Sequence, residues 1–514
     1  MQVCTHVISS LNFTRNNEAR LLPLVEGFLY FAFSAPADLM AYASRIGHMP
    51  AWSTLYNALE ELANHETLVT AAHAQDPSKV GFWQGDNVQN YSKPQEHRIG
   101  RGNRMNIGIA ATYCELEGVD PAALNLEDRR ARILENKRVH LTVDQLVSMI
   151  DNDHLNTVFM LHWLRILVHS IPELSKWKEY VSVLFREKAK KLQLPIQATK
   201  VHPLASSGKN ETVTTELKEA IFDFLTQLGH TEENYTPRLL FAGGDGLTFQ
   251  KMLELQRYLQ FHPDPYQSLE IMEPVLSLWH TEWTDVTRIF ETHWDGLLSQ
   301  DPSSLGHSAS KINRSGPSNL KKVDYHPAVD LMYLVLDVRI LDCWRCVYHF
   351  YYPFIKTKFI CSNHFKCTDS IFSHFTHLEE QNLMPDIEDL LKAAGKLHRA
   401  FSSTHAIYLA LDDTTLDSDW SETVPLGSTW TPHPIIPSSV PNIVVNPAIS
   451  KKPRKKEKPV TRHPNGDRVL ANSITFMRDA LMSREISYAI AEGDVGRVYE
   501  ILKVNVYRLA TSHC

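Results

Sequence analysis

The sequence predicts a mixed α/β fold that is predominantly helical overall. Two apolar stretches, residues 80–83 and 239–242, each lead to a Gly-Asp pair, as a buried strand does when it stops at a turn. Elsewhere apolar residues recur at helical spacing over much of the chain, for example through residues 142–191. We therefore expect a central mixed sheet that is interrupted by large, mostly helical insertions.

The composition is that of a globular protein built from two or three structural units. The chain has 514 residues, of which 43% are hydrophobic and 22% are charged. Its net charge of -7 excludes a uniformly basic nucleic-acid-binding protein, so such binding would use local patches. Seven scattered cysteines and a start without a secretory signal favour a reducing, intracellular location. The most apolar stretch, residues 21–36, contains Glu26 and is too short to span a membrane.

The residue patterns divide the chain into four regions. Residues 1–75 are expected to be helical with a break near Gly47; a helix-turn-helix is one interpretation, but the few basic residues of the second helix favour an ordinary helical hairpin. Residues 76–411 form the expected α/β core with its helical insertions. Residues 412–470 are rich in Pro, Ser and Thr, which indicates a linker. Residues 471–514 are expected to be a helical segment that lacks the natural carboxyl end.

The first candidate site residue is Asp245. It follows an apolar strand pattern and two glycines, which would let a ligand or a neighbouring backbone approach closely. Thr248 is expected to cap the helix that comes next. A carboxylate at the carboxyl end of a buried strand lies where open α/β sheets usually bind ligands. Asp245 is therefore a candidate catalytic and metal-binding residue, although a solvated turn aspartate would give the same pattern.

A second stretch of the same design leads to Asp86. Asn87 follows it, and both side chains could bind a metal ion if the two strand ends meet in one sheet. A basic, glycine-rich turn comes next, and the alternating residues 105–115 predict a second strand, so the segment indicates the start of a β-meander. Arg98 and Arg101 in this turn are candidates for contact with nucleic-acid phosphates. Solvated or carboxylate-paired arginines are the alternative.

Further basic residues form local patches. Loop 299–322 is the best candidate patch for a nucleic-acid backbone, with a solvated loop as an equal alternative; its basic residues are Lys311, Arg314, Lys321 and Lys322. The basic run at residues 451–458 is typical of nuclear import or nucleic-acid contact, or is a solubilising charge run. Residues 206–210 are not a phosphate-binding loop, because the first glycine of that motif is missing and Asn210 replaces its hydroxyl residue.

Histidines and cysteines give weaker signals. His162 and His169 lie on similar faces of the helical stretch 142–191, but no carboxylate or cysteine stands at ligand spacing. We therefore expect these histidines to pack in the core or to face solvent. Two cysteine pairs, Cys343 with Cys346 and Cys361 with Cys367, suggest a zinc site. This interpretation is disfavoured because the second pair is spaced too widely for a zinc knuckle.

Several motifs that occur in order along the chain resemble one protein family. They lie at residues 83–87 (Trp-Gln-Gly-Asp-Asn), 201–210, 243–248 (Gly-Gly-Asp-Gly-Leu-Thr), 278–284, 306–314, 341–345 and 491–497. Over nearly the whole chain after about residue 20, the sequence is similar to the fungal family called "domain of unknown function 6589". The resemblance implies no established activity, but it implies an origin in a mobile element. Residues 347–372 and 505–514 depart from the pattern and look like translated intron sequence.

The order of the acidic residues matches a ribonuclease-H-like nuclease core of the transposase kind. That fold carries one aspartate on its first strand, a second after a later strand and a third acid on a late helix. Asp86, Asp245 and either Glu492 or Asp494 fall in this order and are the candidate catalytic residues. Their carboxylates would hold paired Mg²⁺ or Mn²⁺ ions, which orient water and stabilise the leaving oxygen of a phosphodiester.

The expected metal ligands are Asp86, Asn87, Asp245 and Glu492, and Glu282 and Asp285 compete for the position of the third acid. The function that these residues predict is a metal-dependent nuclease or strand-transfer core that acts on DNA in the nucleus. The main alternative is a catalytically inactive, transposase-derived scaffold that binds nucleic acid or protein. A phosphate-binding hydrolase is a third interpretation, which depends only on the glycine-rich turns.

Overall fold

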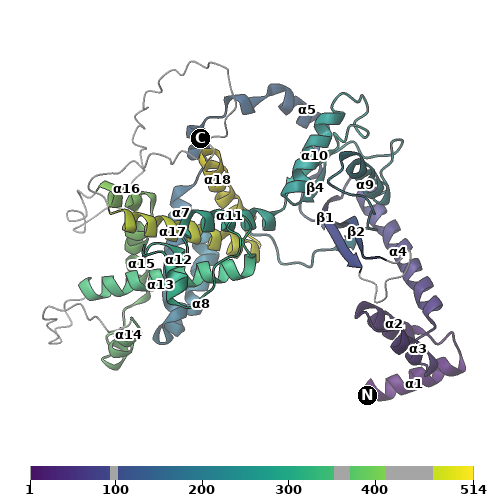
Figure 1. Ribbon diagram of the computed structural model, residues 1–514, viewed down its shortest axis with the longest axis horizontal. Coiled ribbons are helices and arrows are strands. Elements are labelled where there is room, and N and C mark those ends of the chain that lie inside the picture. Colours follow the sequence, from purple (N-terminus) through teal and green to yellow (C-terminus); the bar gives the residue numbers. More distant parts are fainter. Residues whose placement is uncertain (1, 93–101, 352–370, 413–466, 513–514) are drawn as a thin grey trace. The chain divides into compact units, whose positions relative to one another are not determined.

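The chain folds as two compact units, each built from two separate segments (Figure 1). Unit 1 comprises residues 1–140 and 197–280, and unit 2 comprises residues 141–196 and 281–514. The structure is a computed structural model, which describes residues 2–92, 102–351, 371–412 and 467–512.

Unit 1 begins with four helices around a small core. Their bounds are α1 Gln2–Arg15, α2 Leu21–Ala32, α3 Ala37–Arg45 and α4 Trp52–Gln75. The buried apolar side chains of this part are Met40, Ala43, Met49 and Leu55. None of the described residues of α1 belongs to this core. Three large apolar side chains of α1 are instead about half exposed, at 49% for Val7, 57% for Ile8 and 59% for Leu11.

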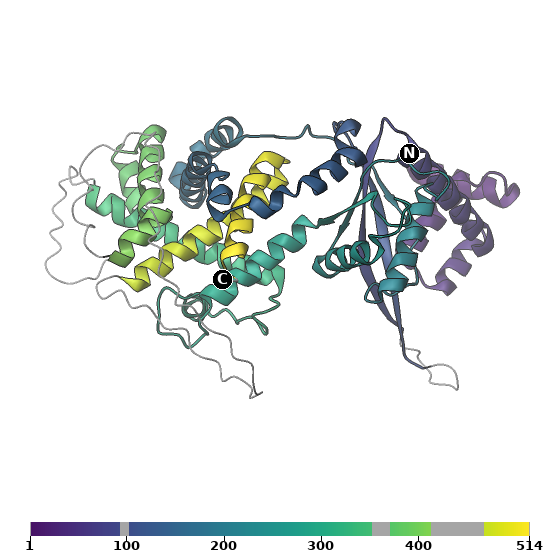
Figure 2. The same cartoon turned by 90° about the horizontal axis from the view of Figure 1, so that it is seen from above.

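A five-stranded mixed sheet lies at the centre of unit 1. Its order is β3-β2-β1-β4-β5, with the bounds β1 Val80–Ser92, β2 Arg104–Leu116, β3 Val201–Pro203, β4 Leu240–Gly244 and β5 Met272–Leu276. β2 is antiparallel to β1 and β3, whereas β4 is parallel to β1 and β5 is parallel to β4. The first three strands form the predicted meander. Figure 2 shows the long β1–β2 hairpin extending past the shorter strands.

Alternation of side chains along β1 determines how the sheet is covered. Trp83 and its partner Tyr113 on β2 are each 1% exposed and belong to the main core of unit 1. Trp83 packs against Phe224 of α9 (Thr214–Gln227), with ring centroids 5.5 Å apart. Helix α10 (Gly246–Leu259) contributes Met252 and Leu255 to the same core, and Figure 1 shows both helices beside the strands. The remaining elements of unit 1 are η1 Pro121–Leu124, α5 Leu126–Glu135 and η2 Lys137–His140.

Unit 2 is helical in the part of the chain that the structure describes. Its helices are α6 Val143–Ser148, α7 Asn152–Ser170, η3 Pro172–Trp177, α8 Lys178–Leu184, η4 Phe185–Ala189, α12 Leu305–Lys311, α13 Tyr325–Tyr351, α14 Ile371–Glu380, α15 Ile387–Phe401, α16 Thr404–Asp412, α17 Arg468–Ala491 and α18 Val495–Ser512, together with most of α11 Leu278–His293. Helix α7 is buried on most of its circumference and contacts α8, α13, α15 and α17. An apolar helix of this kind forms the centre of a helical core.

A buried ionic cluster joins three helices of unit 2. Arg497 Nε and Nη2 donate to the two carboxylate oxygens of Glu485 at 2.7 and 2.9 Å, and His162 Nε2 lies 2.7 Å from Glu485 Oε2. Burial raises the pKa of Glu485, but the hydrogen bonds from His162 and Arg497 outweigh burial, and the pKa is lowered. Burial lowers the pKa of His162. Of the two locations expected for His162, the core or the solvent-facing surface, the structure shows the core.

The mixed α/β, predominantly helical fold that the sequence predicts is confirmed. The predicted cap of α10 is wrong. Asp245 is the N-cap, because its Oδ1 accepts a hydrogen bond from the Thr248 N–H at 2.7 Å. The Thr248 hydroxyl instead donates to Glu211. No helix in the described part of the chain is both long enough and apolar enough to cross a membrane.

Candidate functional site

Neighbouring parallel strands bring Asp86 and Asp245 to one edge of the sheet. Gln84 of β1 pairs with Gly243 of β4, and the two aspartates each lie two residues further along. Asp245 keeps an extended backbone, with φ -69° and ψ -179°, although β4 itself ends at Gly244. Because paired strands lie about 4.8 Å apart, continuation of this register makes the two aspartates neighbours.

The glycine pair before Asp245 allows a tight turn from strand to helix. A Cβ atom on Gly244 would lie 2.7 Å from the Cβ of Thr248, which is too close for any side chain without movement. Thr248 is 1% exposed, so this contact is inside the protein. The second glycine therefore permits Thr248 to lie against the end of β4, where it reaches the acidic residues.

A third carboxylate, Glu211, joins the two aspartates. Glu211 is 1% exposed and accepts a hydrogen bond from Thr248 Oγ1 at 2.7 Å. Thr248 therefore connects the carboxylates of Glu211 and Asp245. Burial raises the pKa of Glu211, and the negative charges of Asp245 and Asp86 raise it further. Hydrogen bonds from Thr248 and Asn87 lower this pKa, but the net effect is a rise above the ordinary glutamate value.

Sequence reasoning missed Glu211. It comes directly after residues 206–210, whose pattern was compared with a phosphate-binding loop. In the structure this loop runs along β2, where the Ile109 N–H donates to the Ser207 carbonyl at 2.8 Å and the Ser207 N–H donates back at 2.9 Å. The extra pairing carries the chain to the acidic end of the sheet. The only local signal was an acidic residue between a strand-like segment and the start of α9.

The side chains at this end of the sheet suit a divalent cation. We call them the acidic edge, which consists of Asp86, Asn87, Glu211 and Asp245. None of the ion pairs among the described residues involves its three carboxylates. The Oδ1 atom of Asn87 is buried and has no hydrogen-bond partner. Among the described residues, the oxygen atoms of these three carboxylates do not all come within 4.8 Å of one another. Mg²⁺ fits such a site, because it is usually held by one or two carboxylates and several waters.

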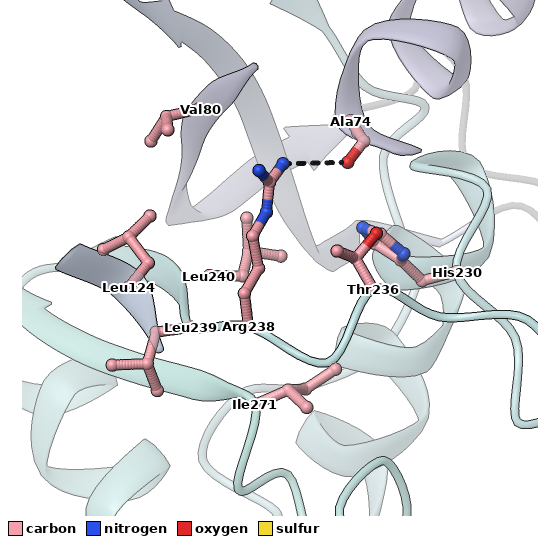
Figure 3. Close-up of a pocket in the computed structure, with 10 residues that line it drawn as sticks. Ala74, Val80, Leu124, His230, Thr236, Arg238, Leu239, Leu240 and Ile271 are labelled. Atoms are coloured by element: carbon pink, nitrogen blue, oxygen red, sulfur yellow. Dashed lines mark hydrogen bonds between the residues drawn. The ribbon is translucent and has the colours of Figure 1, made fainter. Parts of the chain in front are cut away.

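Figure 3 shows a pocket at the opposite ends of the same strands. Its lining includes Val80 and Leu240, where β1 and β4 begin, together with His230 and Arg238. Arg238 donates to three backbone carbonyls at the end of α4, among them that of Ala74 at 3.4 Å. Burial, with a smaller effect of the Arg238 charge, lowers the pKa of His230 to about 4. The pocket lining contains no carboxylate, in contrast to the opposite end of these strands.

Glu492 and Asp494 lie in unit 2 and have partners there. The Asp494 carboxylate accepts the backbone N–H groups of Lys191 and Leu192 at 2.9 Å each and that of Arg497 at 3.1 Å. Glu492 forms an ion pair with the Arg497 guanidinium. Both acids therefore stabilise the junction of α17 and α18. Within unit 1, Glu211 is the carboxylate that the structure brings beside Asp86 and Asp245.

The two other acids considered for the third position also belong to unit 2. Glu282 is 8% exposed and accepts a hydrogen bond from Ser487 Oγ at 2.8 Å. Burial raises the pKa of Glu282. Asp285 lies 2.9 Å from Arg288 Nε, one turn further along α11. Glu282 is thus a buried acid held by a hydroxyl group, and Asp285 is a member of an ion pair.

The candidate nucleic-acid contacts separate into two groups. Arg98, Arg101 and the basic run 451–458 lie outside the described residues, as do Cys361 and Cys367. In contrast, four basic residues of unit 2 are exposed at the end of α12 and in the loop after it, namely Lys311, Arg314, Lys321 and Lys322. Lys322 Nζ lies 5.7 Å from the centroid of the Trp283 ring. These four side chains are accessible to a phosphate backbone.

The fold and the acidic edge define a mixed α/β protein with carboxylates gathered at the ends of two parallel strands. The chain belongs to the Family of unknown function (DUF6589), whose model matches residues 136–514, more than half of the sequence. The matched region contains Glu211 and Asp245 and begins after Asp86. Comparisons with curated proteins and with solved structures gave no match.

Proposed function

We propose that this protein is a metal-dependent nuclease or strand-transfer enzyme of the transposase kind, which acts on DNA phosphodiesters through a ribonuclease-H-like core. The observation that carries the proposal is the location of Asp86 and Asp245 at equivalent positions of adjacent parallel strands. The strand order supports it, since an antiparallel meander is followed by two parallel strands with an aspartate directly after the first of them. The proposed cofactor is Mg²⁺ or Mn²⁺.

Asp86 and Asp245 are the proposed metal ligands, and the unpaired Asn87 Oδ1 is available to a bound cation or to its water. Bound cations would activate a water molecule and stabilise the leaving oxygen of the phosphodiester. Burial and the charges of Asp245 and Asp86 raise the pKa of Glu211, so without a cation this carboxylate takes up a proton more readily than an ordinary glutamate does. A cation nearby would favour the ionised form of Glu211 and recruit it as a further ligand.

The basic residues support the proposed substrate and compartment. Lys311, Arg314, Lys321 and Lys322 are the proposed contacts to the DNA backbone, because exposed lysine and arginine side chains neutralise phosphates. The same contacts make binding sensitive to salt. An enzyme that acts on chromosomal DNA would work in the nucleus, which agrees with the basic run in the sequence at residues 451–458.

Cleavage of DNA by an Asp245→Asn variant tests the proposal. Asparagine caps a helix about as well as aspartate, so the start of α10 is preserved while a charged ligand is lost. We expect Mg²⁺- or Mn²⁺-dependent cleavage by the full chain, and a fall of at least about a hundredfold in the variant. The matched control is Asp120→Asn, which changes an exposed N-cap aspartate of unit 1 outside the acidic edge and should leave cleavage unchanged.

Two results would oppose the proposal. Equal cleavage by the wild-type and Asp245→Asn chains would mean that the acidic edge is not the active site. Binding of DNA by the wild-type chain without any cleavage in Mg²⁺ or Mn²⁺ would favour the alternative, a catalytically inactive, transposase-derived scaffold for nucleic acid or protein.

A further inference from the structure

A second set of metal-ligating side chains lies among the first helices of unit 1. His6 of α1, Glu26 of α2 and His48 of the turn after α3 each offer one ligand atom, and these atoms all lie within 4.8 Å of one another. The His6 Nδ1 atom is 2.6 Å from Glu26 Oε1. The rings of His6 and His48 meet edge to face, with centroids 4.7 Å apart. All three side chains are partly exposed, so an ion could reach them.

The backbone fixes His48 in this position. The N–H of Gly47 donates to the Ser44 carbonyl at 3.2 Å, and the N–H of His48 donates to the Ala43 carbonyl at 2.9 Å. This pair of bonds is the Schellman arrangement that ends α3, and it requires the left-handed backbone of Gly47, whose φ is +77°. A Cβ atom on Gly47 would lie 2.5 Å from Thr14 Cγ2, so α1 packs directly on the turn that carries His48.

Helix α1 contributes little to the apolar core of the first four helices. None of its described residues belongs to the small core of the first four helices, and Val7, Ile8 and Leu11 remain about half exposed. A core of four buried apolar side chains is small for the four helices that surround it. Small units of this kind are commonly stabilised by a structural metal ion, whose binding energy contributes directly to folding.

We propose that His6, Glu26 and His48 bind a zinc ion that ties α1 to α2 and to the turn after α3. Two imidazoles and one carboxylate are a common ligand set for zinc, with a water or another ligand in the fourth position. Imidazole ligands favour zinc over magnesium, which distinguishes this site from the acidic edge of the sheet. The ion replaces the direct contact between His6 and Glu26 with two metal bonds. The site is independent of the proposed nuclease activity.

Zinc content of the full chain tests the proposal. The wild-type protein, loaded with zinc and passed over a desalting column, should retain the metal, and His48→Asn should bind it at least about tenfold more weakly. His65→Asn is the matched control, because His65 is an exposed histidine of the neighbouring helix α4. The Asp245→Asn variant should keep its zinc, which separates this site from the acidic edge. Failure of the wild-type chain to retain zinc, or equal retention by His48→Asn, would overturn the proposal.

A second measurement uses the wild-type chain, so its result does not depend on whether a variant folds. Removal of zinc by a chelator should increase hydrogen exchange along α1, because the helix loses its attachment to α2 and to the His48 turn. Exchange along α10 should stay the same and serves as the internal control. Unchanged exchange along α1 after complete removal of the metal would contradict the proposed role of the ion.

Discussion

Substitution of Arg497 by methionine should strongly destabilise unit 2. Arg497 is 2% exposed and makes two hydrogen bonds to the carboxylate of Glu485, which is itself 1% exposed. Methionine fills much of the space of the arginine stem but carries no charge. The variant would therefore leave the Glu485 carboxylate in the core with His162 as its remaining partner.

The size of the effect follows from the burial of the pair. Removal of one member of a buried ion pair typically costs about 3–5 kcal/mol, because the other charge stays in the core without compensation. The remaining contact with His162 places the expected loss at the lower end, about 3 kcal/mol. For a unit of this size such a loss lowers the melting temperature by roughly 6–12 °C.

The dependence on pH gives the prediction a second test. In the wild-type chain burial is the main cause of the lowered pKa of His162, and the charge of Arg497 adds to it. Without Arg497 one of the causes that lower this pKa is removed, so His162 takes up a proton more readily in the variant than in the wild-type chain. The loss of stability should therefore be largest above about pH 6.5 and smaller below it.

Urea unfolding of the full chain, followed by far-ultraviolet circular dichroism at several pH values, measures both effects. Arg186→Met is the control, because Arg186 and its partner Glu179 are 58% and 81% exposed, and an exposed pair contributes about 0.5 kcal/mol. If Arg497→Met lost less than about 1 kcal/mol at neutral pH, or lost more as the pH fell, the assignment of Arg497 as the partner of a buried carboxylate would be refuted.

Two further predictions concern single acids and bases. Burial lowers the pKa of His202, but hydrogen bonds with Glu66 and Glu115 outweigh burial and the pKa is raised above 6.5. Stability from this contact is fully present below pH 6.5 and is lost as the pH rises through the raised pKa, so His202→Gln should flatten the pH dependence of urea unfolding in that range. Glu492 is 32% exposed, so Glu492→Gln should lower the free energy of unfolding by less than about 1 kcal/mol. It should also leave DNA cleavage unchanged if the acidic edge is the active site. A large loss of cleavage would instead make Glu492 a candidate catalytic residue again.

Local patterns were sufficient to predict most of the elements around the acidic edge. The helix expected after Asp245 is α10, which spans Gly246–Leu259, and the strand expected at residues 105–115 is β2. These predictions succeeded because turn glycines and the alternation of apolar residues depend on neighbours in the sequence. The choice between Asp245 and Thr248 as the cap of α10 could not be made in this way, because both residue types cap helices and the buried partner of Thr248 is Glu211.

Contacts between distant segments could not be predicted from spacing. His162 and Glu485 are separated by 323 residues, so the search for a partner of His162 near it in sequence found none. Glu211 reaches the acidic edge only because its loop pairs with β2, and pairing of this kind depends on the tertiary fold. Side chains from distant segments are brought together by such long-range contacts, so local patterns placed Asp86 and Asp245 at strand ends but gave no sign of the third carboxylate beside them.

The division of each unit into two chain segments has a consequence for biosynthesis. The segment 141–196 leaves the ribosome before the rest of unit 2 has been made, so α7 must wait for α13, α15 and α17 to cover its apolar surface. Nascent chains with an uncovered helix of this kind are prone to aggregate and to bind chaperones. A nonsense mutation before residue 468, where α17 begins, would therefore leave a product that cannot complete its helical half. Neither unit can be produced as a single contiguous fragment, and attempts to express one alone would need the two segments to be joined by design.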